Sequence, residues 1–296
     1  MPNQTRGIGA HVSASGGVEK AMQRVADIGG TVAQVFSGSP RVWKKPSLAD
    51  IDVDTLYSEM QKNNVESIFT HALYLVNLAS NKPDLIQKSL KALRHDLSFD
   101  SLIKGSGVVV HLGSHQGRGW DAVREQVAEN ISALLKDTPD DSRFLIENSA
   151  GQKGKLCSEL TEIKWLLDTL EAKLGADVVA KRVGWCMDTC HAYCAGYQLA
   201  TKESEKNEKN SLHQAITQAK LWDSLKLIHV NDAKDPFGSG RDRHQNLGDG
   251  EIPTADLKAF LTSKEVGAIP LVLEVPGIDG KGPDAENISR LKKLLA

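Results

Sequence analysis

Eight short runs of β-forming residues recur along this 296-residue chain, and a helix-like stretch follows each of them. The runs cover residues 8–12, 32–36, 67–70, 108–111, 144–147, 182–188, 225–230 and 271–275. Strands that alternate with helices form a parallel sheet, because each helix carries the chain back to the same edge. Eight is also the number of strands that closes such a sheet into a barrel. The pattern therefore predicts an α/β fold, a (β/α)8 TIM barrel.

The stretches between the runs have the spacing of amphipathic helices. Residues 83–103 carry leucine and isoleucine at helical intervals and begin with Pro83, which suits a first helical turn. Residues 121–135 and 158–175 follow the same pattern, and Gly175 ends the second of them. A doubly wound open sheet is the alternative, but it usually has fewer strands and a G-x-G-x-x-G turn after the first. Here the first run is followed by SASGG.

Composition places few further limits on the chain. No proline-rich linker or change in composition divides it, so we expect residues 1–296 to form a single domain. The polar segment 201–211 is expected to be a loop without a chemical role. The formal charge of −2 excludes a polycation, so any nucleic-acid partner must meet a local basic patch.

The apolar stretches are too short to cross a membrane, and the first residues contain no apolar signal segment. The chain has four cysteines whose spacing matches neither a zinc ribbon nor a redox pair: Cys157, Cys186, Cys190 and Cys194. Buried thiols in a reducing compartment are the expectation. We therefore expect a soluble intracellular protein with no membrane partner.

Six consecutive strands, the third to the eighth, deliver histidine or a carboxylate at their carboxyl ends or in the following loop. The residues are His71, His111, Glu147, Asp188, His191, His229, Asp242, His244 and Glu274. A single histidine at a strand end is more often a capping residue, and a single carboxylate is usually a helix N-cap. In a barrel, however, these ends meet on one face, where buried charges need partners or a metal. The sequence therefore predicts a metal centre at that face.

Imidazole and carboxylate ligands without thiolate suit zinc, with manganese and iron as second choices. Nine donors exceed the needs of one tetrahedral ion and fit three ions if one carboxylate bridges two of them. Asp242 and His244 are two residues apart, so an extended segment points both at one ion. We expect His11 to lie inside the barrel beneath the site, and His115 to be a supporting residue or a substrate contact. His95 and His213 fall in helical segments and are expected on the surface.

Several longer motifs occur together: HVSASGG, THALYLVNLAS, HLGSH, LIENSAGQ, DTCHAYCAGY, HVNDAKDPFGSGRDRHQNLGDGEI and LVLE. Collectively, and over nearly the whole chain, they resemble the endonuclease IV family, the zinc-dependent apurinic/apyrimidinic endonucleases of base excision repair. The resemblance implies a TIM barrel with three zinc ions, with manganese or iron as an alternative at one site. By matching motif, the first ion takes His71, His111 and Glu147. The second shares Glu147 and takes Asp188, His229 and Glu274, and the third takes His191, Asp242 and His244.

The same resemblance implies side chains that enter DNA at the lesion. Tyr74 and Leu75 align with the pair that penetrates the helix, and Arg41 aligns with an inserted arginine. Ordinary loop packing is the plain alternative for Tyr74 and Leu75. We also assign His115, Arg241 and Arg243 to DNA binding, among further basic residues in the site-face loops: Lys44, Lys45, Arg118, Lys153, Lys155 and Lys234. Two departures from the family pattern, Leu112 and Pro253, touch no predicted ligand.

The activity implied is hydrolysis of the phosphodiester 5′ of abasic sites in duplex DNA, leaving a 3′-hydroxyl and a 5′-deoxyribose phosphate. Glu147 is the predicted catalytic residue because it holds two ions together. We expect a cytoplasmic, nucleoid-associated monomer, or a nuclear or mitochondrial one if the source is eukaryotic. A metal-dependent TIM-barrel sugar isomerase or epimerase is the alternative function, and the Asp242–His244 pair is the feature that distinguishes the two. A non-catalytic DNA-binding relative would have lost ligands, and none is missing here.

Overall fold

Eight parallel strands close into a barrel in the computed structural model, which describes residues 6–199 and 211–296. The strands are β1 (Ile8–His11), β2 (Val32–Phe36), β3 (Ser67–His71), β4 (Val108–Val110), β5 (Phe144–Glu147), β6 (Val183–Asp188), β7 (Leu225–His229) and β10 (Leu271–Leu273). Each lies within two residues of its predicted bounds. β10 pairs with both β1 and β7, and this pairing completes the ring. The predicted TIM barrel is confirmed, and the open-sheet alternative is wrong.

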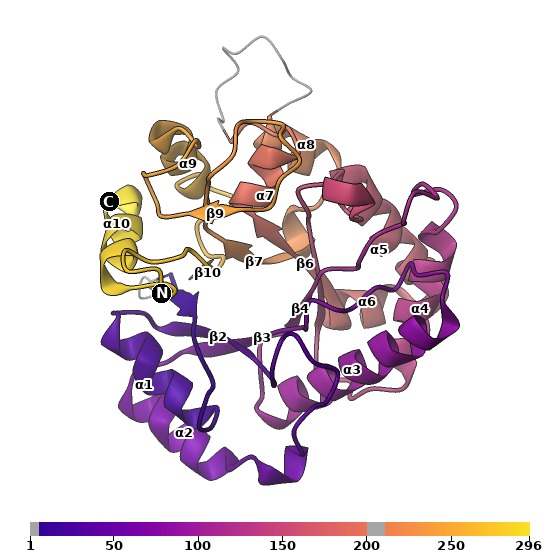
Figure 1. Ribbon diagram of the computed structural model, residues 1–296, viewed down its shortest axis with the longest axis horizontal. Coiled ribbons are helices and arrows are strands. Elements are labelled where there is room, and N and C mark those ends of the chain that lie inside the picture. Colours follow the sequence, from indigo (N-terminus) through magenta and orange to yellow (C-terminus); the bar gives the residue numbers. More distant parts are fainter. Residues whose placement is uncertain (1–5, 200–210) are drawn as a thin grey trace.

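Helices surround the strands on the outside of the barrel (Figure 1). They are α1 (Glu19–Asp27), α2 (Val53–Lys62), α3 (Pro83–Leu102), α4 (Arg124–Lys136), α5 (Leu160–Leu174), α6 (Ala176–Arg182), α7 (Thr189–Cys194), α8 (Leu212–Gln218), α9 (Thr254–Leu261) and α10 (Ala285–Leu295), with short helical turns η1 (Leu48–Asp50), η2 (Gln152–Gly154) and η4 (Trp222–Ser224). Pro83 begins α3 as expected. Gly175, whose φ of 91° suits glycine, ends α5.

Alternate strand residues face the two sides of the barrel wall. Inside, one buried apolar cluster fills the barrel, and its members are Val32, Phe69, Val109, Leu145, Cys186, Leu227 and Val272. Outside, strand residues such as Ala33 and Ile68 pack with helix residues such as Val25 and Leu56. All four cysteines are buried and unpaired, in agreement with the expected thiols. This cluster fills the barrel interior with apolar side chains, so the strand ends are where polar side chains can gather.

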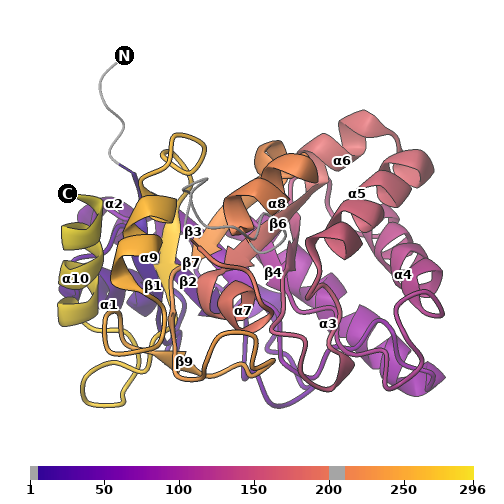
Figure 2. The same ribbon diagram turned by 90° about the horizontal axis from the view of Figure 1, so that it is seen from above.

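A short antiparallel pair, β8 (Asp232–Ala233) with β9 (His244–Gln245), was not predicted. It lies beyond the carboxyl end of β7, among the loops along the lower edge of Figure 2. The Asp232 carboxylate accepts hydrogen bonds from the backbone N–H groups of Ala233, Gly248, Gly250 and Ile252, at 2.8 to 3.1 Å. Asp232 thereby fixes this excursion of the chain, which carries Asp242 and His244 back to the barrel mouth.

His95 and His213, expected on the surface of helical segments, lie in α3 and α8 and are only partly exposed. His95 is half-buried, because its Nε2 atom lies 2.9 Å from the Pro46 carbonyl oxygen. His213 is also half-buried, against the Trp222 ring and 3.0 Å from Glu265. The predicted loop at 201–211 falls outside the described residues except for Ser211. Where the chain is described, no helix combines the length and apolarity that a membrane crossing requires. That residues 1–296 form one domain stays a prediction.

Asp100 of α3 provides a test of the packing between this helix and β3. Thr70 donates a hydrogen bond of 3.1 Å to Asp100 Oδ1, while Oδ2 is buried and has no hydrogen-bond partner among the residues that the structure describes. Burial raises the pKa of Asp100 to about 7, although hydrogen bonds from Thr70 and the Gly107 N–H oppose the shift. The folded protein therefore holds a proton that the unfolded chain, with a pKa of about 3.9, releases earlier.

Stability should consequently fall as the pH rises from about 4 to about 7, by up to about 1.4 kcal/mol per pH unit from this group. The Asp100→Asn variant should lack this part of the pH dependence. Urea unfolding at several pH values measures the difference. The control is Glu129→Gln on the exposed face of α4. Parallel pH profiles for the Asp100→Asn variant and the wild type would contradict the assignment.

Candidate metal centre

The nine predicted ligands converge at the carboxyl ends of the strands. β3, β5, β6 and β7 end on His71, Glu147, Asp188 and His229, while His111 and Glu274 directly follow β4 and β10. Three groups of donor atoms each lie within 4.8 Å of one another: His71, His111 and Glu147; Glu147, Asp188, His229 and Glu274; and Asp188, His191 and His244. Glu147 belongs to two of these groups, as the prediction of a shared carboxylate requires.

The first group gathers two imidazoles on one oxygen of Glu147. Oε2 of this carboxylate lies 3.1 Å from His111 Nε2 and 3.5 Å from His71 Nε2. His71 donates its Nδ1 proton to the Ala72 carbonyl at 2.6 Å. That bond selects the tautomer whose Nε2 lone pair faces Glu147, which is the form that binds a cation.

The second group surrounds the Nδ1 atom of His229. This nitrogen lies 3.0 Å from Glu147 Oε1, 3.3 Å from Glu274 Oε2 and 3.9 Å from Asp188 Oδ2. The His229 and Glu147 side chains are completely buried. Three carboxylates around one imidazole leave excess negative charge, which suits a divalent cation.

The third group includes Asp242 and His244, which the segment between β8 and β9 brings back to the barrel mouth. Asp242 Oδ1 lies 3.0 Å from His191 Nε2 and 3.5 Å from His244 Nε2. His191 is held by its own Nδ1, which donates to the Asn148 carbonyl at 3.0 Å. Asp188 Oδ2 also approaches His244 Nε2, at 3.7 Å. Asp242, His244 and His191 thus meet as predicted, and Asp188 lies between the second and third groups.

Protonated histidines partly neutralise the negative charge of the buried carboxylates. Burial opposes a charge on His191, but the carboxylates of Asp188 and Asp242 outweigh it and raise the pKa of His191 to about 10. Burial likewise opposes ionisation of Glu147, yet the surrounding histidines hold its pKa well below the usual range. His111 differs, because burial dominates and lowers its pKa to about 4. The site is therefore a coupled set of histidines and carboxylates that favours bound positive charge.

Three buried amide side chains that the sequence analysis missed hold the ligands in place. Asn231 donates to Asp188 Oδ2 at 2.6 Å and accepts from the Glu274 N–H at 2.8 Å. Asn148 accepts from the Asp188 N–H at 2.7 Å. Gln34 on β2 is fully buried beneath the centre. Asn148 and Asn231 follow Glu147 and His229 by one and two residues, and this proximity is the signal that could have identified them.

Gln34 determines which nitrogen of His229 faces the carboxylates. Its Oε1 atom lies 2.7 Å from His229 Nε2, and its Nε2 atom donates to Glu274 Oε1 at 2.6 Å. With a proton on Nε2, His229 presents the Nδ1 lone pair to the centre. His11 lies 2.9 Å from Glu274 Oε1, so it supports the site from inside the barrel as expected.

The donor set fits divalent metal ions. Three polar atoms that face the centre, Glu147 Oε2, His191 Nε2 and His244 Nε2, are buried without a hydrogen-bond partner among the described residues. Such orphaned atoms are rare unless they serve as ligands. A cavity of about 340 Å³ opens above them, and its lining includes Tyr74 and Pro276.

The predicted DNA contacts lie around this opening. Tyr74 and Leu75 are 56% and 37% exposed, respectively, and the Tyr74 ring lies 5.7 Å from the His71 ring. The Tyr74 N–H donates to the Pro40 carbonyl at 3.2 Å, so Tyr74 and the exposed Arg41 project from adjoining loops. The half-buried His115 lies in the loop after β4, and its Nδ1 atom accepts hydrogen bonds from the Gly117 and Gly119 N–H groups.

Arg241 and Arg243 are less free than the sequence suggested. Arg243 forms a two-bond ion pair with Asp235, with Nε 2.6 Å from Oδ2, and Arg241 lies 3.4 Å from the same carboxylate. Both arginines remain exposed at the protein surface, so their roles in DNA binding stay predictions. Lys155 pairs with Asp242 at 3.0 Å and brings a positive charge to the edge of the third group.

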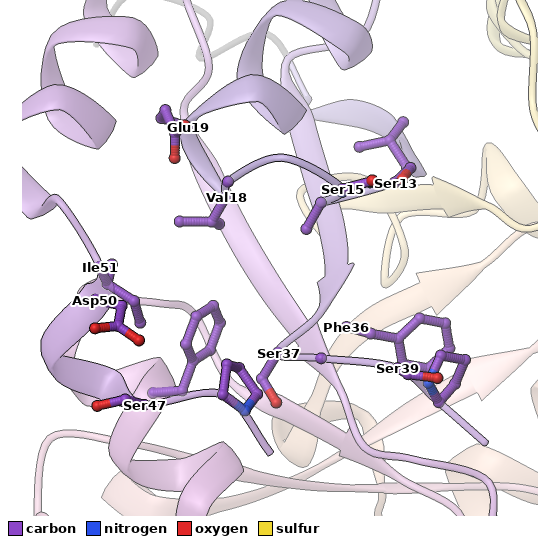
Figure 3. Close-up of a pocket in the computed structure, with 17 residues that line it drawn as sticks. Ser13, Ser15, Val18, Glu19, Phe36, Ser37, Ser39, Ser47, Asp50 and Ile51 are labelled. Carbon is purple, nitrogen blue, oxygen red and sulfur yellow. Dashed lines mark hydrogen bonds between the residues drawn. The ribbon is translucent and has the colours of Figure 1, made fainter. Parts of the chain in front are cut away.

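A second cavity of about 550 Å³ adjoins the mouth between the loops that follow β1 and β2 (Figure 3). Ser13, Ser15 and Val18 line one side, and Ser37 and Phe36 line another. The Phe36 ring lies 4.4 Å from the His11 ring and 5.4 Å from the Tyr74 ring. Phe36 therefore forms a wall between this cavity and the ligand cluster.

Comparison with known proteins agrees with this geometry. The family described as xylose isomerase-like TIM barrel matches residues 22–294. A relative from Halobacterium salinarum, named "Probable endonuclease 4", is 34% identical over 98% of this chain and 99% of its own length. The crystal structure of endonuclease IV from Thermus thermophilus is similar with a TM-score of 0.80 and 29% identity, over 98% of both chains.

Sugar epimerases share the architecture at greater distance. D-psicose 3-epimerase from Clostridium cellulolyticum gives a TM-score of 0.63 at 16% identity, over 96% of this chain and 89% of that one. An identity this low shows a common fold alone. The relatives of higher identity are similar from end to end, and the predicted ligands meet at the face where a TIM barrel carries its site. The chain belongs to the endonuclease IV family of xylose isomerase-like TIM barrels.

Proposed function

We propose that this protein is a DNA repair endonuclease that hydrolyses the phosphodiester 5′ of abasic sites in duplex DNA. It acts as a monomer with a trinuclear zinc centre and leaves a 3′-hydroxyl and a 5′-deoxyribose phosphate. The meeting of Asp242 and His244 with His191 carries the proposal, because it adds a third cation site to a shared pair. Similarity along the whole chain to relatives named "Probable endonuclease 4" supports it.

The ligand sets follow the donor groups. His71, His111 and Glu147 would hold one ion, while Glu147, Asp188, His229 and Glu274 would hold a second. His191, Asp242 and His244 would hold the third, with Asp188 close enough to assist. Bound zinc supplies Lewis acidity and lowers the pKa of a coordinated water to about 7, which provides a nucleophile at neutral pH. Manganese or iron is an alternative at one of the sites.

The chain's own task is to hold these donors rigid and to admit a phosphodiester. Gln34, Asn148 and Asn231 orient the ligands through their hydrogen bonds. The Lys155 ammonium lies beside Asp242 at the cavity edge, where it can neutralise a phosphate oxygen. Glu147 has the central role, since its two oxygens face different groups.

Recognition of the lesion is assigned to the exposed Tyr74, Leu75 and Arg41. Side chains that enter a base stack must offset the cost of unstacking, and a missing base lowers that cost. Tyr74 adjoins His71 through ring contact, so a stack opened by Tyr74 would present its backbone to the ligand cluster.

A metal-dependent sugar epimerase or isomerase is the second candidate, supported by the fold shared with D-psicose 3-epimerase. Such enzymes usually use one or two ions in a site richer in carboxylates. Asp242 and His244 would then have no function, although their excursion is anchored by four hydrogen bonds to Asp232. The third group therefore favours the nuclease.

Metal removal tests the proposed function directly. The wild-type protein should cleave a duplex that contains one synthetic abasic site, and it should lose this activity after treatment with a chelator and regain it with zinc. Elemental analysis should give three ions per chain for the wild type and two for His244→Ala, because one ligand of the third group is lost. One or two ions in the wild type, together with keto–aldose exchange on a sugar panel, would instead assign an isomerase.

Glu147→Gln should reduce cleavage by about 10³-fold or more, because the shared carboxylate holds two cation sites together. Circular dichroism should still show a folded barrel. Glu171→Gln on the exposed side of α5 provides a control that keeps wild-type rates. Near-normal turnover of an abasic duplex by Glu147→Gln would refute the role of this carboxylate.

Tyr74→Ala should weaken binding to abasic duplex by about tenfold, since stacking of one aromatic side chain on a base contributes about 1–3 kcal/mol. Leu75→Ala should weaken it as well, since an apolar side chain that enters the base stack is lost. Binding to undamaged duplex should change less, because an intact stack resists insertion. Fluorescence anisotropy measures both affinities. The control is Val178→Ala, a similarly exposed residue of α6 at the opposite end of the barrel. Equal losses on damaged and undamaged duplex would show that the two residues do not recognise the lesion.

A further inference from the structure

The loop that carries Arg41 is fixed to α3 by a buried ion pair. Lys45 Nζ lies 2.5 Å from Asp96 Oδ1, with side-chain exposures of 9% and 0%. Ser37 donates to the same oxygen at 2.5 Å, and His95 contacts the Pro46 carbonyl. The charge of Lys45 is therefore neutralised by the buried Asp96, and this ion pair holds the loop against α3.

Outside this anchor, a recess of about 510 Å³ separates the loop from α3. Its lining is basic and aromatic and contains no acidic side chain: Trp43, Lys44, Lys45, Pro46, Lys88, Lys91, Ala92 and His95. Lys44, Lys88 and Lys91 are exposed, and none of them forms an ion pair within the described parts of the chain. Three ammonium groups around one recess repel one another unless an anion lies among them.

The recess is continuous with the predicted DNA-binding edge. Lys44 lies three residues after Arg41, at most about 11 Å along the chain. α3 begins on the loop after the carboxyl end of β3, so its first turns lie on the side of the barrel mouth. Lys88 and Lys91 are three residues apart in the first half of this helix and therefore share one face.

We infer that this recess binds a backbone phosphate of the duplex beyond the lesion, so that the DNA footprint continues from the mouth over the first half of α3. Lysine ammonium groups bind phosphate as point charges without reading sequence, and Trp43 supplies an apolar wall. The occupant is identified by charge complementarity and by continuity with Arg41 and Tyr74. The inference rests on the proposed function, because it assumes a duplex centred on the ligand cluster.

The test variant is Lys88→Gln combined with Lys91→Gln, since glutamine preserves helix propensity and removes both charges. Neither residue contacts the metal ligands. The matched control is Lys136→Gln combined with Lys173→Gln, two exposed lysines in the last turns of α4 and α5, at the opposite end of the barrel. Steady-state cleavage by the zinc-loaded proteins is measured on two abasic duplexes, one with a long arm and one whose arm ends beside the lesion.

On the long duplex, the test variant should raise KM roughly fivefold with kcat unchanged. The slope of log(kcat/KM) against log salt should become shallower by about 0.9, which is the value for one phosphate contact. On the short duplex, the test variant, the control and the wild type should have the same KM and the same salt slope.

A wild-type KM and salt slope for the test variant on the long duplex would overturn the inference, provided that the wild type cleaves abasic DNA. Equal losses on long and short duplexes would also overturn it, because they would indicate damage to the centre. If polyglutamate bound the wild type but not the test variant while DNA kinetics stayed normal, the recess would belong to an acidic protein partner instead. Failure of the wild type to cleave any abasic duplex is a different result, which would refute the proposed function itself.

Discussion

The buried carboxylate of Glu147 is the constraint around which the rest of the site is arranged. It is completely inaccessible to solvent, and four imidazoles lie 3.0 to 3.5 Å from its oxygens: His71, His111, His191 and His229. An isolated carboxylate could not remain ionised in this position without positive partners. Three of these histidines, His71, His191 and His229, have their other ring nitrogen fixed by a hydrogen bond to Ala72, Asn148 or Gln34. Residues that contact no substrate, such as Gln34 and Asn148, are therefore as much a part of the site as the ligands.

The barrel and the nine donors could be predicted from the sequence because both follow from simple periodicity. Short apolar runs indicate the strand bounds, and the rule that strand ends share one face places His71 and Glu274 together. Gln34 could not be found in this way, since it interrupts an apolar run and only the closed barrel shows which side it faces. The β8–β9 pair was missed for a related reason, because two-residue strands have no periodicity to detect.

The sequence also did not show which basic side chains form ion pairs. Arg241, Arg243 and Lys155 have the same formal charge, but Asp235 binds the two arginines and Asp242 binds the lysine. In contrast, Lys88 and Lys91 belong to an ordinary amphipathic helix, and only the packing of the Arg41 loop against α3 reveals their shared recess. Counts of basic residues in loops therefore indicated that positive charge is present near the site but not how it is distributed.

The closure of the barrel has a consequence for when the proposed metal ions could bind. The donors begin with His71 and end with Glu274, which follows the strand that seals the ring between β1 and β7. Contacts between residues so far apart in sequence form late, because the chain entropy of closing large loops must be lost first. A nascent or partly unfolded chain would consequently offer only fragments of the three donor groups. All three donor groups would then be able to bind ions only after the barrel has closed, so metal binding would follow folding and could not precede it.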